Sequence, residues 1–93
     1  MNQNLPFEVL RQLRAQGKTL ATAESCTGGL IGKLLTDVPG SSEVYMGGVI
    51  SYTNGVKHRL LGVSEDTLRV YTAVSRQTAH EMARGAREAV RAD

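Results

Sequence analysis

One short segment, from Ala23 to Gly29, holds the residues with the clearest chemical potential. Its serine, Ser25, lies shortly before a Gly-Gly pair, where a chain can turn from a strand into a helix. A serine hydroxyl at such a turn becomes a nucleophile once a neighbouring group takes its proton. The first N–H groups of a helix have no partners within it, and they can hold an oxyanion or a phosphate. We expect such unpaired donors at four positions, Cys26, Thr27, Gly28 and Gly29.

Ser25 has no base in its own segment, so a partner must come from elsewhere in the chain. Tyr52 ends the second apolar run, and Lys57 follows about one helical turn later. Because the carboxyl ends of parallel strands meet at one sheet edge, both side chains can face the same crevice. Removing a lysine from water lowers its pKa and lets it act as a base, with a tyrosine hydroxyl relaying the proton. We therefore predict a catalytic group of Ser25, Tyr52 and Lys57.

Each of these residues also fits a simpler structural role. A serine in this position more often caps a helix than catalyses a reaction. Free cysteines are often buried, so we expect Cys26 to be a small buried side chain. Tyr52 fits a strand aromatic with its hydroxyl at the surface, and Lys57 fits a solvated lysine on a helix. The residue types alone leave these alternatives open.

The elements that must position these residues follow from apolar spacing and capping residues. Predicted strands cover residues 19–25 and 44–52, and the Gly47-Gly48 pair in the second indicates close backbone packing or a bulge. Predicted helices cover residues 6–16 and 27–37, and further helices are capped by Thr53, Ser64 and Ser75.

This order of elements predicts an α/β fold in which helices cover a mostly parallel sheet. A sheet of two strands is marginal in water. We therefore expect its free edges to pair with a segment absent from the chain or with a second copy of it.

Composition narrows the classes of function. The chain has 93 residues, enough for one domain, and a net charge of +2 with scattered basic residues gives no indication of nucleic-acid binding. A single cysteine excludes an internal disulfide framework and suits a cytoplasmic location. His58 and His80 lack the neighbours of a metal site, so we expect both at the surface. No signal sequence and no apolar run of ~20 residues is present, so we expect no membrane segment.

Several stretches together resemble the CinA C-terminal domain family, the nicotinamide-nucleotide amidases. The most specific is Glu-Ser-Cys-Thr-Gly-Gly at residues 24–29. It is followed by Gly-Gly-Val-Ile-Ser-Tyr-Thr-Asn at 47–54, Leu-Leu-Gly-Val at 60–63, Ala-Val-Ser at 73–75 and Glu-Met-Ala-Arg-Gly-Ala at 81–86. The resemblance covers essentially the whole chain in the family's order.

The resemblance implies a metal-free and cofactor-free hydrolysis of nicotinamide mononucleotide to nicotinic acid mononucleotide and ammonia, through an acyl-enzyme on Ser25. Tyr52 and Lys57 match the family's supporting tyrosine and lysine. The family domain continues past the helix that begins after Ser75 into further strands and a Gly-x-Ala-Gly-Pro segment. We therefore expect only the N-terminal part of the domain here, in a homo-oligomer. The alternative is an inactive, self-associating binding module of the same fold.

Overall fold

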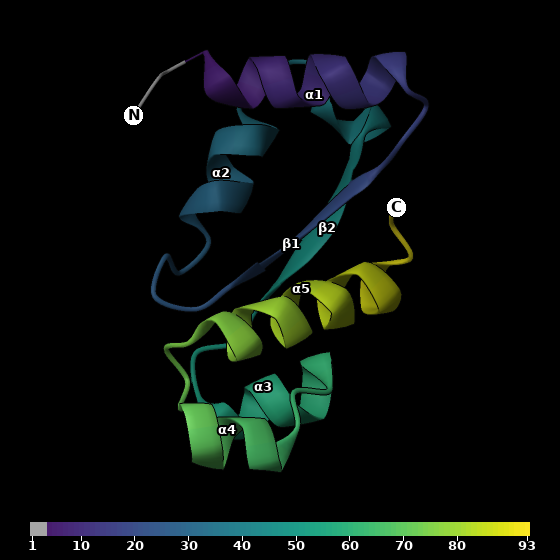
Figure 1. The fold of residues 1–93 in the computed structure, drawn as a ribbon. Coiled ribbons are helices and arrows are strands. Elements are labelled where there is room, and N and C mark those ends of the chain that lie inside the picture. The colour runs from purple at the N-terminus through teal and green to yellow at the C-terminus, as the bar shows by residue number, and fades with distance from the viewer. Residues whose placement is uncertain (1–3) are drawn as a thin grey trace.

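The computed structural model describes residues 4–93 as an α/β arrangement of helices around two strands (Figure 1). The elements in chain order are α1 (Leu5–Ala15), β1 (Leu20–Glu24), α2 (Leu30–Thr36), the 3-10 turn η1 (Ser41–Glu43), β2 (Tyr45–Ile50), α3 (Asn54–Leu61), α4 (Glu65–Tyr71) and α5 (Arg76–Val90). The predicted order of helices and strands is confirmed. The helix predicted to begin at residue 27 instead begins at Leu30, because its capping group comes from the preceding strand, as described below.

The two strands form a parallel pair, as predicted, with Glu24 opposite Ile50 at their carboxyl ends. An irregularity in the register lies between Leu20 and Ala21. Helices α1 and α2 lie on one side of this ribbon, and α3, α4 and α5 lie on the other (Figure 1). Within residues 4–93 neither outer edge of the sheet has a further strand, so both edges are open.

The first of two apolar clusters joins α3 and α5 to the sheet. Its buried members are Leu61, Val63, Met82 and Ala86, with Ala23 and Val49 of the strands packed against them. Helices α3 and α5 approach very closely at Gly85, where an added Cβ would lie 1.9 Å from the carbonyl oxygen of Leu61. Only glycine fits at that contact, so Gly85 fixes how deeply α3 sits against α5.

The second apolar cluster joins α1 and α2 to the other side of the sheet. Leu10, Leu35 and Val44 are its buried members. Beside it, the Tyr45 hydroxyl forms a hydrogen bond of 2.7 Å with the Thr22 hydroxyl. An added Cβ at Gly48 would lie 2.4 Å from Thr22 Oγ1, so the close packing predicted at the Gly47-Gly48 pair is confirmed at Gly48.

Three helices begin where capping residues predicted them. The side chains of Thr53, Ser64 and Ser75 each accept a hydrogen bond from the N–H three residues later, at the starts of α3, α4 and α5. Gly62 ends α3 in the left-handed conformation with φ of 68°, which a residue without a Cβ adopts readily.

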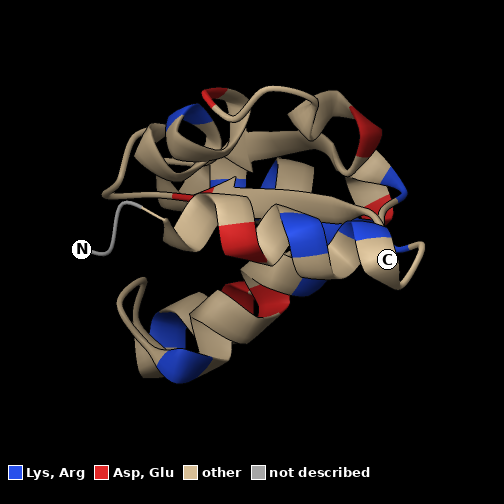
Figure 2. Ribbon diagram, turned by 90° about the horizontal axis from the view of Figure 1, so that it is seen from above, with Lys and Arg blue, Asp and Glu red and all other residues tan. Residues whose placement is uncertain are grey.

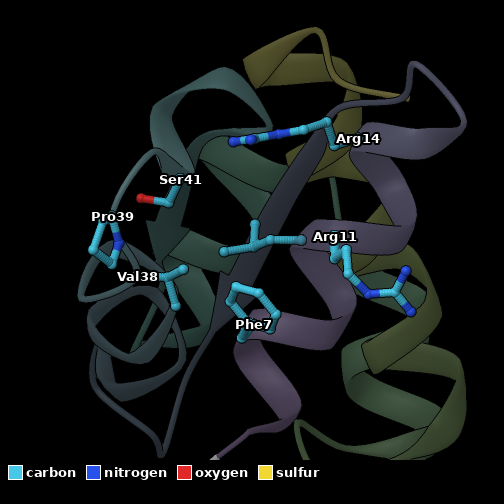
Figure 3. A pocket seen from close by; sticks show the side chains of 7 residues that line it. Phe7, Arg11, Arg14, Val38, Pro39 and Ser41 are labelled. Carbon is cyan, nitrogen blue, oxygen red and sulfur yellow. The ribbon is translucent and has the colours of Figure 1, made fainter.

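Charged residues of both signs are spread over several elements (Figure 2). A shallow pocket of about 100 Å³ between α1 and Pro39 is bordered by two arginines (Figure 3). Arg14 pairs with Glu43 and donates to the Gly40 carbonyl, and Arg11 pairs with Glu8. Both guanidinium groups at this pocket are therefore already engaged.

Candidate functional site

A buried carboxylate shapes the turn after β1. Glu24, the last residue of β1, is only 4% exposed. Its two oxygens accept hydrogen bonds of 2.9 to 3.0 Å from the backbone N–H groups of Gly29, Ile31 and Gly32. These are the donors that the start of α2 would otherwise leave unpaired. Glu24 therefore caps α2 from the strand that precedes it.

The same contacts keep Glu24 ionised. Burial by itself raises the pKa of a carboxyl group. Here the backbone N–H groups of Gly32, Ile31 and Gly29, with the Thr27 hydroxyl, outweigh burial and hold the pKa of Glu24 below its usual value. The positive end of the α2 dipole favours the same charge. A fixed negative charge thus lies directly beneath the turn that carries Ser25.

The backbone N–H groups of Gly28 and Gly29 are paired, whereas the sequence led us to expect them to be free. The N–H of Gly28 donates to the Ser25 carbonyl, and the N–H of Gly29 donates to Glu24. The prediction of unpaired donors is therefore wrong for these two residues, because the turn and the buried carboxylate already use them. Among the described residues, no hydrogen-bond acceptor faces the N–H of Cys26 or Thr27. The remaining candidate oxyanion donors are these two groups.

Neither of the simpler structural roles, Ser25 as a helix cap and Cys26 as a buried side chain, is found in the structure. Gly29 holds the N-cap position of α2 and Glu24 supplies the capping oxygens, so Ser25 does not cap this helix. Within residues 4–93 the Ser25 hydroxyl makes no hydrogen bond. Cys26 is exposed rather than buried, because it lies in the turn after β1 and not in either apolar cluster.

Ser25 borders a groove of about 390 Å³ between β1 and α5. Its walls come from β1 and the turn after it, from the connection before α5, and from the first half of α5. The lining residues are Ala21, Ala23, Glu24, Ser25, Cys26 and Thr27 with Ala73, Val74, Ser75, Ala79, Met82 and Ala83. The lining of small side chains leaves the Ser25 hydroxyl accessible from solvent along the groove.

The end of β2 holds a buried lysine. Lys57 is only 2% exposed, which excludes the alternative of a solvated lysine. It lies four residues before Leu61, so the two side chains share the buried face of α3. Its Nζ donates to the backbone carbonyl of Tyr52 at 3.0 Å, and no carboxylate in the described part of the chain pairs with it. Ser51, the residue before Tyr52, is fully buried, and its hydroxyl has no partner among residues 4–93.

The Tyr52 side chain lies apart from both of these groups. It is 76% exposed, and its hydroxyl makes no hydrogen bond within the described residues. Neither Tyr52 nor Lys57 lines the groove at Ser25. The structure brings Tyr52 and Lys57 together through the Tyr52 carbonyl, and it places both at the end of the strand adjacent to β1. It shows no direct contact between either residue and Ser25.

Sequence reasoning gave no role to Glu24 or Ser51, or to Val74 at the groove wall. Glu24 carried a readable signal, because a carboxylate just before a helix start suits the helix dipole. Val74 is 94% exposed in the connection before α5, and no local pattern indicates that it approaches Ser25.

Residues 4–93 contain no group of three or more His, Cys, Asp and Glu side chains arranged to bind a metal ion. His58 and His80 are exposed, as expected. None of the helices described is long and apolar enough to cross a bilayer.

Comparison with known proteins identifies the family of the chain. The family model for the CinA C-terminal domain matches residues 2–93. The chain belongs to the CinA C-terminal domain family. Among curated proteins, it is 57% identical over 88 residues to a CinA-like protein from Leptospira interrogans, covering 94% of this chain and 21% of that protein. It is 52% identical over 85 residues to a CinA-like protein from Thermotoga neapolitana, covering 91% of this chain and 21% of that protein.

Solved structures agree with the fold. The competence/damage inducible protein of Agrobacterium tumefaciens is 44% identical with a TM-score of 0.89, covering 97% of this chain and 53% of that one. A CinA superfamily protein of Escherichia coli is 38% identical with a TM-score of 0.95, covering 98% of this chain and 53% of that one. The chain thus spans about half the length of these solved relatives and about a fifth of the curated ones.

Proposed function

We propose that this chain carries the nucleophile of an amidohydrolase that converts nicotinamide mononucleotide to nicotinic acid mononucleotide and ammonia. The observation that carries the proposal is the free Ser25 hydroxyl in an open groove beside the unpaired N–H groups of Cys26 and Thr27. Membership of the CinA C-terminal domain family supports the same choice of residue. No metal or cofactor is required for this chemistry.

The proposed reaction begins with attack of Ser25 Oγ on the carboxamide carbon, while a base takes the hydroxyl proton. The N–H groups of Cys26 and Thr27 then hold the oxyanion of the tetrahedral intermediate. Protonation of the amide nitrogen releases ammonia and leaves an ester on Ser25. Water hydrolyses this ester, which frees the carboxylate product and restores the serine.

Lys57 and Tyr52 are the proposed supporting residues. The Lys57 amine is held at the carboxyl end of β2 by the Tyr52 carbonyl, away from bulk water. In the proposal its neutral amine accepts the serine proton, becomes an ammonium, and returns the proton to the leaving nitrogen. The exposed Tyr52 hydroxyl relays that proton when substrate fills the crevice. Glu24 acts only by holding the turn in place, since its oxygens are occupied by α2.

The decisive experiment measures ammonia release from nicotinamide mononucleotide by the purified chain. We expect release that Ser25→Ala reduces by at least about 10³-fold, because the variant removes the attacking atom. Ser42→Ala, at an exposed serine outside the groove, is the matched control and should retain activity. Release that is absent from the parent chain, or unchanged in Ser25→Ala, would overturn the proposal.

A second variant separates chemistry from folding. Lys57→Met removes the amine but keeps a buried side chain of similar length, and its apolar tip adds no buried polar group. We expect Lys57→Met to lose activity while its unfolding midpoint stays within a few degrees of the parent. Retained activity would remove Lys57 from the mechanism.

The second candidate is a binding module without catalysis. It is favoured by the absence of Tyr52 and Lys57 from the groove that holds Ser25. In that case the chain would bind a partner through its open sheet edges. A second copy of the chain is one such partner, and the result is a homo-oligomer. Ammonia release that depends on Ser25 would exclude this candidate as the sole role.

A further inference from the structure

The register of the sheet makes Ser25 and Ser51 neighbours across the two strands. Glu24 lies opposite Ile50, and the N–H of Ser51 donates to the Glu24 carbonyl at 2.8 Å. Pairing therefore reaches the residues that follow, and Ser25 and Ser51 are the next lateral pair. Neighbouring strands lie about 4.8 Å apart, a separation at which two hydroxyl side chains on one face can form a hydrogen bond.

Both serine side chains lie on the side of the sheet that α5 covers. Side chains alternate between the two faces along each strand. Ala23 and Val49 pack against the apolar cluster of α3 and α5. They precede Ser25 and Ser51 by two residues, so all four side chains share this face. Ser25 accordingly borders the groove between β1 and α5, while Ser51 is fully buried.

Lys57 approaches the Ser51 end of β2 from the same side. It shares the buried face of α3 with Leu61, which belongs to the same apolar cluster. Its Nζ donates to the carbonyl of Tyr52 at 3.0 Å, and Tyr52 directly follows Ser51. Ser51 is therefore next to Ser25 across the sheet, and next to the anchor of the Lys57 amine along the chain.

The Ser51 hydroxyl is buried without a compensating hydrogen bond. In the part of the chain that the structure describes, it is the only buried side-chain nitrogen or oxygen that has no partner. Such a group lowers stability relative to alanine, and one reason for a protein to keep it is a catalytic role. A hydroxyl both donates and accepts, so it can take a proton from one neighbour while it gives its own to another.

We propose that the Ser51 hydroxyl relays the proton of Ser25 to the Lys57 amine. This inference rests on the proposed function and supplies the link between two residues that make no direct contact. As Ser25 Oγ bonds to the carboxamide carbon, its proton passes to Ser51 Oγ. The original Ser51 proton passes to the neutral Lys57 amine, which becomes an ammonium, so Ser51 itself ends unchanged. The exposed Tyr52 hydroxyl then serves the return of the proton to the leaving nitrogen.

The relay is tested by a reaction that does not depend on the identity of the substrate. A fluorophosphonate, which phosphonylates activated serine hydroxyls with loss of fluoride, is added to the purified chain, and the rate of labelling at Ser25 is followed by mass spectrometry. We expect Ser51→Ala to slow labelling by about 10²-fold or more, because it breaks the proton path. Ser51→Thr keeps a hydroxyl and should retain most of the parent rate, as should the exposed-site control Ser42→Ala.

A double variant separates a relay from a structural role. If Ser51 acts through Lys57, the combination of Ser51→Ala with Lys57→Met should label no more slowly than Lys57→Met alone. The unfolding midpoint of Ser51→Ala should be at or above that of the parent, since the variant removes an unpaired buried hydroxyl.

Two kinds of failure are distinguishable. A Ser51→Ala rate equal to the parent's would overturn the relay, as would losses that multiply in the double variant or a parent whose Ser25 is not labelled. Ammonia release from nicotinamide mononucleotide that persists in Ser51→Ala would leave the proposed function in place without the relay. Labelling that depends on Ser51, in a chain that releases no ammonia, would support the relay and reject that substrate.

Discussion

The carboxyl ends of β1 and β2 lie side by side, yet they present their polar groups in opposite ways. At the end of β1 the carboxylate of Glu24 is buried, and the Ser25 hydroxyl is open to a groove. At the end of β2 the Ser51 hydroxyl and the Lys57 amine are buried, and only the Tyr52 side chain is open. One end exposes a hydroxyl to a groove, and the other keeps a hydroxyl and an amine away from water.

Different contacts hold these two ends in place. The β1 end depends on hydrogen bonds from Glu24 to the start of α2. The β2 end depends on α3, which carries Lys57 and is seated against α5 at Gly85. Each contact can be broken alone, so the contribution of each end can be measured separately.

The largest effect is expected at Gly85, where α5 contacts the end of α3. Gly85→Ala places a Cβ within 2 Å of the Leu61 carbonyl oxygen unless α3 moves, so we expect a loss of about 3 kcal/mol in the free energy of unfolding. Denaturant unfolding measures it. The control is Gly55→Ala in α3, where an added Cβ meets nothing within 4 Å and alanine should raise stability by ~0.5 kcal/mol. Equal effects of the two substitutions would show that α3 does not depend on this close contact.

The next effect is expected at the β1 end. Glu24→Gln removes the charge that three backbone N–H groups surround, and we expect a loss of about 2 kcal/mol in the free energy of unfolding at neutral pH. Denaturant unfolding again measures it. Glu8→Gln, at an exposed pair with Arg11, should leave stability nearly unchanged.

The pH dependence of stability provides an independent check on Glu24. Its pKa is lowered in the folded chain, so its contribution is complete above the unfolded pKa of about 4.3 and is lost as pH falls through the folded value. The parent should therefore lose stability on acidification more steeply than Glu24→Gln. If the free energy of unfolding fell equally steeply with decreasing pH in the two proteins, this account would be contradicted.

The smallest effect is expected at the buried hydroxyl of Ser51, just after β2. Ser51→Ala removes a polar group that has no partner within residues 4–93, so stability should rise by about 1 kcal/mol. Thermal unfolding of this variant alongside the exposed-site variant Ser42→Ala measures the difference. A loss of stability instead would mean that the Ser51 hydroxyl contributes to holding the β2 end.

Local chemistry explains which parts of the fold could be predicted from the sequence. Thr53, Ser64 and Ser75 each bond to an N–H three residues away, so their capping is visible in the sequence itself. The start of α2 was misplaced because its cap, Glu24, reaches forward from a strand rather than sitting at the N-cap position. The N–H groups at the start of α2 bond to Glu24 because its carboxylate is buried beneath them. That burial depends on the packing of segments that are distant in the sequence.

The same reasoning applies to the candidate site. Ser25 could be singled out because its motif is local and specific. The burial of Lys57 depends on α3 being held against α5, which brings together residues far apart in sequence. The groove wall at Val74 likewise depends on the path of the chain between α4 and α5. The catalytic roles of Ser25, Tyr52 and Lys57 remain predictions.

The hydrogen bond between Tyr45 and Thr22 has a practical spectroscopic consequence. The chain contains three tyrosines and no tryptophan. Tyr52 and Tyr71 are exposed, whereas Tyr45 is partly buried against the sheet with its hydroxyl bonded to the neighbouring strand. We therefore expect the near-ultraviolet circular dichroism of the folded chain to arise mainly from the Tyr45 ring, which lies on β2 and bonds to β1 through its hydroxyl. That signal provides a label-free optical report of strand pairing.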